Sequence, residues 1–226
     1  MKHIIPDARL QMVATLVPKG ARLADIGSDH AYLPVYLIQS GKITQALATD
    51  VNFGPIERAQ KNIALAGLRD KIQTRRCDGL CGVEDFAPDT VSIAGVGGEL
   101  IVSILDKSDY VRENAPLLIL QPMTQIAFLR RYLAQKGYDI FSEHLVPDEH
   151  RIYQIIVCRY LALPSRKLGA LAELAGEKTK DSPVLPELMA KLKRQYADII
   201  AGKKIAGQST TAEESILQEI LAYETH

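Results

Sequence analysis

Residues 23–34 read Leu-Ala-Asp-Ile-Gly-Ser-Asp-His-Ala-Tyr-Leu-Pro, an apolar run that ends in an acidic, glycine-containing turn. This order is typical of a β-strand that leads into a ligand-binding loop and then a helix. A second apolar run, residues 46–48, is followed by Thr49 and Asp50. Nucleotide-binding βαβ units place a ribose-binding carboxylate roughly 20 residues after the first turn. The pattern therefore predicts that Asp25 and Asp50 hold a ribose between neighbouring strand ends.

Composition places the chain among folded globular proteins. Its 226 residues are 47% hydrophobic and 24% charged. No apolar run approaches the roughly 20 residues that cross a bilayer, and the first 18 residues lack a signal-peptide pattern. We therefore expect no membrane association and a cytoplasmic location, with a monomer favoured. The three cysteines, Cys77, Cys81 and Cys158, have a spacing that fits neither a disulfide framework nor a zinc site, so we expect no metal.

Hydrophobic periodicity alternates between strand and helix along the first 160 residues. Strands are expected at residues 22–26, 46–49, 71–76, 90–94, 117–121, 138–146 and 153–159. Helices are expected at residues 7–17, 32–39, 55–66, 99–105 and 126–135. The short connection at 147–151 favours an antiparallel final pair at the sheet edge. The pattern predicts an α/β protein of the doubly wound kind, with seven strands.

The composition changes after Pro164, which divides the chain into a domain at residues 1–163 and an extension at 164–226. Helical patterns at residues 168–175, 188–200 and from 211 onward predict a helical hairpin in this extension. Although the net charge is zero, residues 151–204 hold 11 Lys or Arg against 5 Asp or Glu. Lysines and arginines that lie mostly off the hairpin seam suit contacts with phosphates, and the alternative is an ordinary solvated face. These residues are Lys191, Lys193, Arg194, Lys203 and Lys204.

The turn after the first strand suits a positively charged ligand. Gly27 lets backbone amides approach a ligand, while Asp25 and Asp29 suit a sulfonium and an amino group better than a pyrophosphate. The dinucleotide fingerprint GxGxxG is absent, because Gly27 is followed by Ser-Asp-His-Ala, and this disfavours an oxidoreductase. After the third strand, Asp78-Gly79 is placed to contact an adenine edge, although an Asp-Gly pair also marks an ordinary turn.

Glycines and one amide follow the fourth and fifth strands. In an open α/β sheet the ligand cleft lies outside the carboxyl ends of these strands. Gly95, Gly97 and Gly98 would allow a flat base to approach the backbone, and Gln121 beside Pro122 offers an amide that can read a base edge. This region is predicted to be the substrate side of the cleft.

Four motifs together resemble the TrmK-type tRNA (adenine-N1)-methyltransferases. They are Asp25-Ile-Gly-Ser-Asp-His-Ala-Tyr-Leu-Pro, Asp78-Gly-Leu, Ile93-Ala-Gly-Val-Gly-Gly and Leu120-Gln-Pro, and Arg9-Leu-Gln adds to the likeness. The resemblance extends through about residue 160 and implies a class I methyltransferase (Rossmann-like) sheet, S-adenosylmethionine as cofactor and adenine 22 of tRNA as substrate. It also implies a C-terminal helical hairpin that binds tRNA. Family members usually read Gln-Pro-Asn where this chain has Gln121-Pro122-Met123.

The resemblance assigns cofactor-site roles residue by residue. The cofactor-binding candidates are Asp25, Gly27, Ser28, Asp29, His30, Asp50, Asp78, Gly79 and Gly95. The substrate-binding candidates are Arg9, Gly97, Gly98, Gln121, Pro122, Lys193, Arg194 and Lys203. Adenine N1 carries its own lone pair, so catalysis should come from orientation, exclusion of water and electrostatics rather than from a strong base.

Asp29 and Tyr32 are the catalytic candidates. Asp29 would stabilise the positive charge that develops on the base, or serve the cofactor alone. Tyr32, like His30, would orient the base, unless it only packs at the start of the helix. A supporting hydrogen bond is favoured over proton transfer for His30. Two alternatives remain open: an idle RNA-binding protein with a methyltransferase fold, and a small-molecule methyltransferase.

Overall fold

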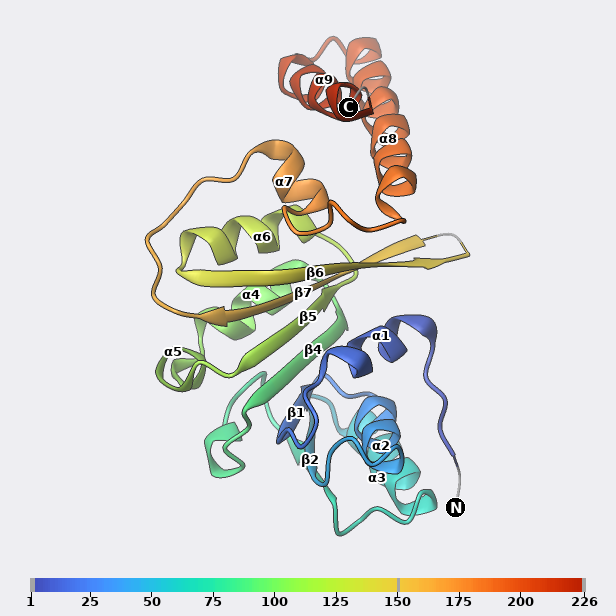
Figure 1. Cartoon of the computed structure of the whole chain (residues 1–226), viewed down its shortest axis with the longest axis vertical. Helices are drawn as coiled ribbons and strands as arrows, with labels where there is room; N and C mark the ends of the chain where they lie inside the picture. Colours follow the sequence, from blue (N-terminus) through green and yellow to red (C-terminus); the bar gives the residue numbers. More distant parts are fainter. Residues whose placement is uncertain (1–2, 150, 225–226) are drawn as a thin grey trace.

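A computed structural model describes residues 3–149 and 151–224 of the chain. Within these residues, seven strands form one mixed sheet in the order β3-β2-β1-β4-β5-β7-β6 (Figure 1). The strands are β1 (Leu23–Ile26), β2 (Ala46–Asp50), β3 (Ile72–Arg76), β4 (Thr90–Val96), β5 (Leu117–Pro122), β6 (Tyr138–Asp148) and β7 (Arg151–Tyr160). Strands β1 to β5 are parallel, and β7 runs antiparallel between β5 and β6. The predicted α/β sheet with a closing antiparallel pair is confirmed.

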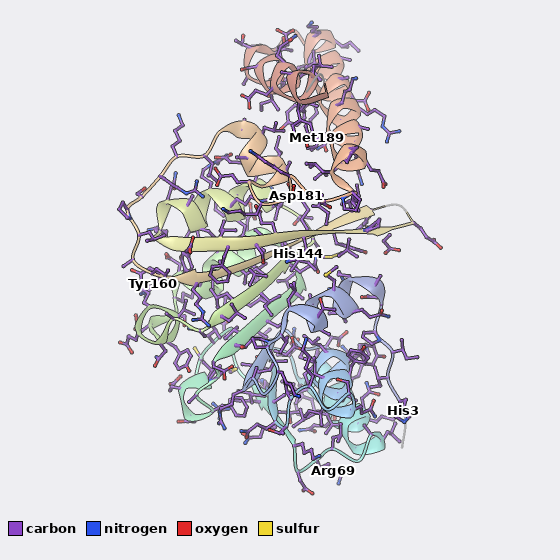
Figure 2. All side chains as sticks on the ribbon, in the orientation of Figure 1. His3, Arg69, His144, Tyr160, Asp181 and Met189 are labelled. Carbon is purple, nitrogen blue, oxygen red and sulfur yellow. The ribbon has the colours of Figure 1, made fainter. Side chains whose placement is uncertain are left out.

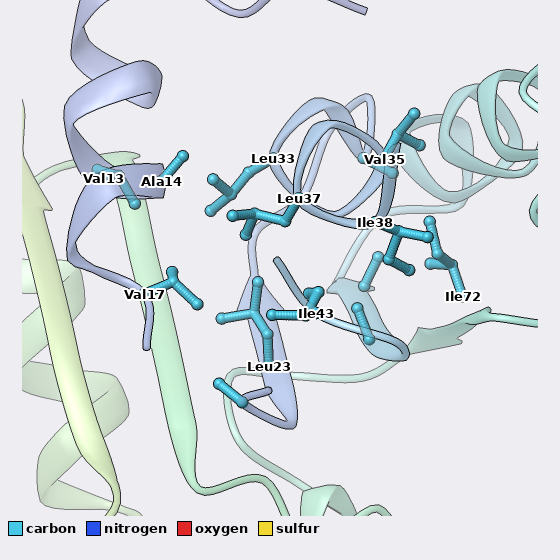
Figure 3. Packing of buried hydrophobic residues seen from close by; sticks show 14 of the residues in the cluster. Val13, Ala14, Val17, Leu23, Leu33, Val35, Leu37, Ile38, Ile43 and Ile72 are labelled. Carbon is cyan, nitrogen blue, oxygen red and sulfur yellow. The ribbon is translucent and has the colours of Figure 1, made fainter. Parts of the chain in front are cut away.

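Helices cover both faces of this sheet, as its apolar strands require. They are α1 (Ala8–Leu16), α2 (Tyr32–Gln39), α3 (Phe53–Leu65), α4 (Gly98–Asp106), α5 (Asp109–Asn114) and α6 (Ile126–Gln135), with a short 3-10 turn at Val83–Asp85. One core layer joins α1, α2 and α3 to the sheet, and the other joins α4 and α6 to it. Figure 3 shows the first layer, where Val13 of α1 and Val17, just after α1, meet Leu23 of β1 and Leu37 of α2. All four residues of β1 are buried, which fixes the loop that follows it.

The C-terminal extension consists of α7 (Ala170–Ala175), α8 (Leu185–Ile205) and α9 (Thr211–Glu224). Helices α8 and α9 form the predicted hairpin, which stands beyond the sheet and rests on α7 (Figure 1). Helix α8 begins before the predicted residue 188, because Pro186 is tolerated in the first turn, where its missing N–H is not needed. It also continues past Ile200 to Ile205.

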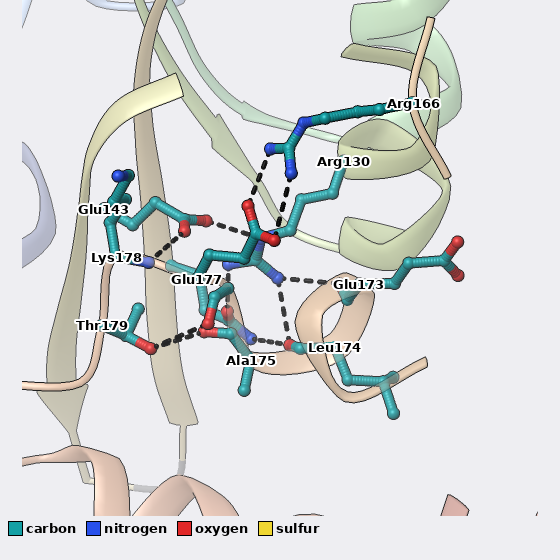
Figure 4. A network of polar contacts seen from close by, with 11 residues as sticks. Arg130, Glu143, Arg166, Glu173, Leu174, Ala175, Glu177, Lys178 and Thr179 are labelled. Carbon is teal, nitrogen blue, oxygen red and sulfur yellow. Dashed lines mark hydrogen bonds and ion pairs between the residues drawn. The ribbon is translucent and has the colours of Figure 1, made fainter. Parts of the chain in front are cut away.

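A buried arginine joins this extension to the sheet (Figure 4). The Arg130 side chain of α6 is 1% exposed and donates from Nε to Glu143 Oε1 of β6 at 2.6 Å. Its Nη1 donates to the backbone oxygens of Glu173 and Leu174 at 2.9 and 3.0 Å, and its Nη2 donates to Gln154 Oε1 at 2.8 Å. The guanidinium therefore has an acceptor for each of its three nitrogens and fixes α7 against the sheet.

Local details of the structure differ from the sequence-based expectations. The β6–β7 connection is shorter than the predicted 147–151, because Pro147 and Asp148 pair with β7 as part of β6. Helix α5 was not predicted; it has only six residues, and the Ser108 side chain caps it. At the start of α9 the Thr210 hydroxyl donates to Glu214 Oε1 at 3.0 Å.

Candidate active site

The loop between β1 and α2 is shaped by two left-handed residues. Gly27 has φ +73°, a conformation that favours glycine, and Ala31 holds φ 54° at the start of α2. The Ser28 N–H donates to the Thr49 carbonyl of β2 at 2.8 Å, which ties the loop to the neighbouring strand. A non-glycine residue in this conformation stores backbone strain of order 1–3 kcal/mol, of the kind that collects at ligand sites.

Asp25 is the buried charge of the site. Burial raises its pKa to about 6, and the nearby Ser28 and Ser92 hydroxyls and the Arg9 guanidinium oppose this shift. Neither hydroxyl makes a hydrogen bond of good geometry within the described residues. A cationic ligand bound beside the Asp25 carboxyl would stabilise its charged form.

Arg9 and Gln121 form a second element of the site. The Gln121 side chain is fully buried, and its Oε1 accepts from Arg9 Nη1 at 2.8 Å and from the Gly95 N–H at 3.0 Å. Its Nε2 donates to the Pro122 carbonyl at 2.8 Å. Both ends of the Gln121 amide, which is predicted to read a base edge, are engaged inside the protein in this structure. Its contacts instead hold Arg9 and the β4 turn.

An ion pair and an aromatic pair lie on the open side of the loop. The Asp29 carboxylate accepts from Arg58 Nε of α3 at 2.9 Å and lies 3.2 Å from His30 Nε2. The His30 and Tyr32 rings are stacked, with centroids 4.9 Å apart and planes 13° apart. Asp29 is half exposed and already paired, so its charge is partly compensated before any ligand binds.

These elements enclose a cavity of about 310 Å³ at the carboxyl edge of β1 and β4. Six of the nine predicted cofactor residues line it, namely Asp25, Gly27, Ser28, Asp29, His30 and Gly95. Both catalytic candidates, Asp29 and Tyr32, line it as well, and so does Arg9. The region is small and acidic at its base, with an aromatic pair at its rim, and we name it the Asp25 pocket.

Three predicted cofactor residues lie outside the Asp25 pocket. Asp78 and Gly79 line a separate groove of about 850 Å³ beside α4, where Asp78 faces Lys107 Nζ at 4.0 Å. Asp50 ends β2, and its Oδ1 accepts from the Asn52 N–H at 2.8 Å. The three follow adjacent strands, as predicted, but the structure does not gather them into one cavity with Asp25.

Gly97 and Gly98, which are predicted to let a flat base approach the backbone, instead lie close to the β5–α6 turn. A Cβ on Gly98 would lie 2.5 Å from the Gln125 carbonyl, and one on Gly97 would lie 3.2 Å from Thr124 Oγ1. The space above these glycines is thus filled by the β5–α6 turn rather than left open for a base. Pro122 lines a neighbouring cavity, described below.

The basic residues of the hairpin are not equivalent. Lys203 Nζ lies 2.6 Å from Glu213 Oε1 of α9, so it crosses the hairpin seam instead of lying off it as predicted. Lys204 pairs with Glu214 at 2.9 Å. Arg194 is exposed and Lys193 is half-buried on α8. Within the described residues there is no cluster of three or more His, Cys, Asp or Glu side chains that could hold a metal ion.

Sequence reasoning missed Arg58, Ser92 and Tyr153. Each contacts a site residue from a different element: Arg58 pairs with Asp29, Ser92 neighbours Asp25, and the Tyr153 ring lies 5.7 Å from the Arg9 guanidinium carbon. None belongs to a motif, and only the tertiary arrangement brings them to the pocket.

Comparison with known proteins agrees with this geometry. Residues 7–156 match the family described as a methyltransferase domain. The Bacillus subtilis protein named tRNA (adenine(22)-N(1))-methyltransferase is 36% identical over 157 residues, which cover 70% of this chain and 66% of that protein. The crystal structure of the B. subtilis m1A22 tRNA methyltransferase TrmK has a TM-score of 0.80 at 28% identity and covers 98% of this chain and 96% of its own. Streptococcus pneumoniae Sp1610 in complex with S-adenosyl-L-methionine has a TM-score of 0.83 at 32% identity and covers 96% of this chain and all of its own.

The sheet order and the pocket at its carboxyl edge define a class I methyltransferase. With these matches, the chain belongs to the methyltransferase-domain family and, within it, to the TrmK group of tRNA (adenine-N1)-methyltransferases. Its cofactor is S-adenosylmethionine. The residues present fit that molecule, because Asp25 offers a buried carboxylate to a cationic head group and Gly27 keeps the loop free of a side chain.

Proposed function

We propose that this protein transfers the methyl group of S-adenosylmethionine to N1 of adenine 22 in tRNA. The observation that carries the proposal is the Asp25 pocket, an acidic cavity at the carboxyl edge of the sheet with the stacked His30 and Tyr32 rings at its rim. The activity named for the B. subtilis relative supplies the substrate.

Methyl transfer requires the protein mainly to position the cofactor and the adenine. The bound cofactor supplies a methyl group on a positively charged sulfur. With the cofactor held beside Asp25 and Gly27, adenine N1 would accept this methyl group through its own lone pair, and the positive charge would pass from sulfur to the base. No proton needs to be removed, so the rate acceleration comes from alignment of the cofactor with the base and from exclusion of water. Adenine N1 is engaged in base pairs within RNA helices, so the base must be exposed to react.

We assign the wall of the Asp25 pocket to this task. Tyr32, stacked on His30, supports the base, and Asp29 offers a carboxylate to the cation that forms. The Arg58 pairing holds Asp29 in place but weakens its field at the base. Arg9, held by Gln121, borders the same cavity and is positioned to meet the substrate.

The remaining proposed contacts lie further out. Asp50, Asp78 and Gly79 follow β2 and β3, where the nucleoside end of the cofactor would extend along the sheet edge. Lys193, Arg194 and Lys203 are proposed to meet tRNA phosphates from α8, Lys203 only after exchanging its Glu213 partner. We expect a cytoplasmic monomer that acts on tRNA. No helix in the described part of the chain is long and apolar enough to cross a membrane.

Nucleoside analysis tests the proposal. Unmodified tRNA transcript is incubated with the protein and methyl-labelled S-adenosylmethionine, digested and examined by mass spectrometry. The proposal predicts labelled 1-methyladenosine. Cofactor binding without labelled nucleoside across a tRNA panel would favour the idle RNA-binding alternative. Methylation of a small substrate that survives deletion of residues 165–226 would favour a small-molecule enzyme.

A further inference from the structure

A second cavity, of about 310 Å³, lies where the catalytic sheet meets the C-terminal hairpin. Its walls come from the turn between β5 and α6, the first residues of β7 and one side chain of α8. We name it the junction pocket, and the residues that matter to its chemistry are Pro122, Gln125, Arg151, Tyr153, Gln154 and Lys191.

The junction pocket adjoins the Asp25 pocket. Tyr153 lines the junction pocket, Arg9 lines the Asp25 pocket, and the Arg9 guanidinium carbon lies 5.7 Å from the Tyr153 ring centroid. Pro122 lines the junction pocket immediately after Gln121, which holds Arg9. The Arg9 and Tyr153 side chains therefore lie between the two cavities, so one RNA segment could reach both.

Cations from two separate parts of the chain line this pocket. Arg151 comes from β7 of the sheet and Lys191 from α8 of the extension, and both are exposed. Among its described lining residues there is no aspartate or glutamate. The positive charge of the junction pocket is thus suited to an anion. A ligand there would contact both the catalytic sheet and the extension.

Hydrogen bonds hold in place the wall of the junction pocket that Gln154 forms. Gln154 is 9% exposed; its Oε1 accepts from Arg130 Nη2 at 2.8 Å, and its Nε2 donates to the Leu174 carbonyl at 3.2 Å. The same Arg130 binds Glu143 and the end of α7 (Figure 4). The buried network therefore fixes α7 to β7, and α8, which carries Lys191, packs against α7.

We propose that the junction pocket binds the phosphate of a tRNA nucleotide that flanks the methylated adenine. This inference rests on the proposed function and adds a specific subsite to it. Turning the adenine out into the Asp25 pocket presents the phosphates on either side of it to the adjoining surface. Arg151 and Lys191 neutralise one of them, and the Tyr153 ring offers a face for the flanking base. The extension thereby acts in the alignment of the target base as well as in holding tRNA.

Charge reversal tests the inference. Arg151→Glu and Lys191→Glu are assayed for tRNA affinity over a salt series, for kcat/KM of methyl transfer and for S-adenosylmethionine affinity. We expect each to weaken tRNA binding on the order of tenfold and to reduce the slope of log K against log salt by about 1, with cofactor affinity unchanged. Arg151→Gln should give a smaller loss in the same direction, and Lys191→Arg should retain wild-type affinity.

Arg69→Glu is the matched control. Arg69 is exposed in the loop between α3 and β3, at the opposite end of the molecule from Met189 of α8 (Figure 2). The inference is overturned if the wild type methylates tRNA while both pocket variants match Arg69→Glu in affinity and salt slope. It is also overturned if inorganic phosphate binds the wild type and not the variants while tRNA parameters stay the same. Absence of tRNA methylation by the wild type would instead refute the proposed function itself.

Discussion

Gln121 Oε1 accepts one hydrogen bond from Arg9 Nη1 at 2.8 Å and another from the Gly95 N–H at 3.0 Å. Arg9 belongs to α1 and lies 112 residues away in the sequence. One buried amide therefore joins the first helix, the β4 turn and the end of β5 around the Asp25 pocket. Its role is to position the residues that face the ligand.

Replacement of this amide should loosen the pocket. Gln121→Leu fills a similar volume but leaves the Gly95 N–H without an acceptor, at a cost of about 1–3 kcal/mol in unfolding free energy. It also frees Arg9, so KM for tRNA should rise more than kcat falls. Urea denaturation and steady-state kinetics measure the two effects. Gln121→Glu keeps both acceptor contacts and should preserve the Arg9 position; equal behaviour of the two variants would refute the assigned role.

The buried carboxyl of Asp25 should make stability depend on pH. Because its folded pKa is about 6, above the usual aspartate value of 3.8, the folded state holds the proton more tightly than the unfolded state. The free energy of unfolding of the ligand-free protein should therefore fall as pH rises from about 4 to 6, by up to about 3 kcal/mol. Asp25→Asn should lack this contribution and be the more stable above pH 6. A constant wild-type minus variant difference from pH 4 to 7 would contradict the burial argument.

The same carboxyl should link cofactor affinity to pH. A cationic head group favours ionised Asp25, so S-adenosylmethionine binding should weaken below about pH 6 and release protons there. Calorimetry in two buffers of different ionisation enthalpy measures that release. Asp25→Asn should bind weakly at every pH, and affinity equal to wild type would exclude Asp25 from the cofactor site.

Replacement of Arg130 alone should lower the free energy of unfolding. Arg130→Met leaves Glu143 as a buried charge whose remaining hydrogen-bond partner among the described residues is the Lys178 N–H, which predicts a loss of about 3–5 kcal/mol in unfolding free energy. Arg130→Met with Glu143→Leu should recover most of that loss, because no uncompensated charge remains. Urea denaturation measures the free energy of unfolding of both variants. A double variant no more stable than Arg130→Met would show that the contacts to α7, rather than the buried charge, dominate.

Asp29 is tested by separating turnover from binding. Asp29→Asn keeps its size and should lower kcat several-fold with little change in S-adenosylmethionine affinity, because its proposed partner is the charge that forms on the base. Asp70→Asn, at an exposed carboxylate in the α3–β3 loop, serves as the control. Equal losses in kcat and cofactor affinity would make Asp29 a binding residue.

The fold was largely readable from the sequence, and the site was only partly so. Apolar strands that end in Asp25, Asp50 and Gly95 predicted the sheet edge, since parallel strands place their carboxyl ends together. Side-chain orientation was not predictable in the same way. Gln121 turns into the protein because Arg9 and Gly95 satisfy it, and Lys203 turns to the seam because Glu213 lies opposite. Both outcomes depend on partners far away in sequence or on another helix.

Methyl transfer to two tRNA transcripts that differ only at position 22 tests the central claim most directly. With wild-type protein and S-adenosylmethionine, the transcript with adenine at this position should gain one methyl group at N1, and the transcript with guanine there should gain none. The Asp25→Asn variant should methylate neither at the same cofactor concentration. Equal methylation of both transcripts by the wild type, or full activity of Asp25→Asn, would contradict the account.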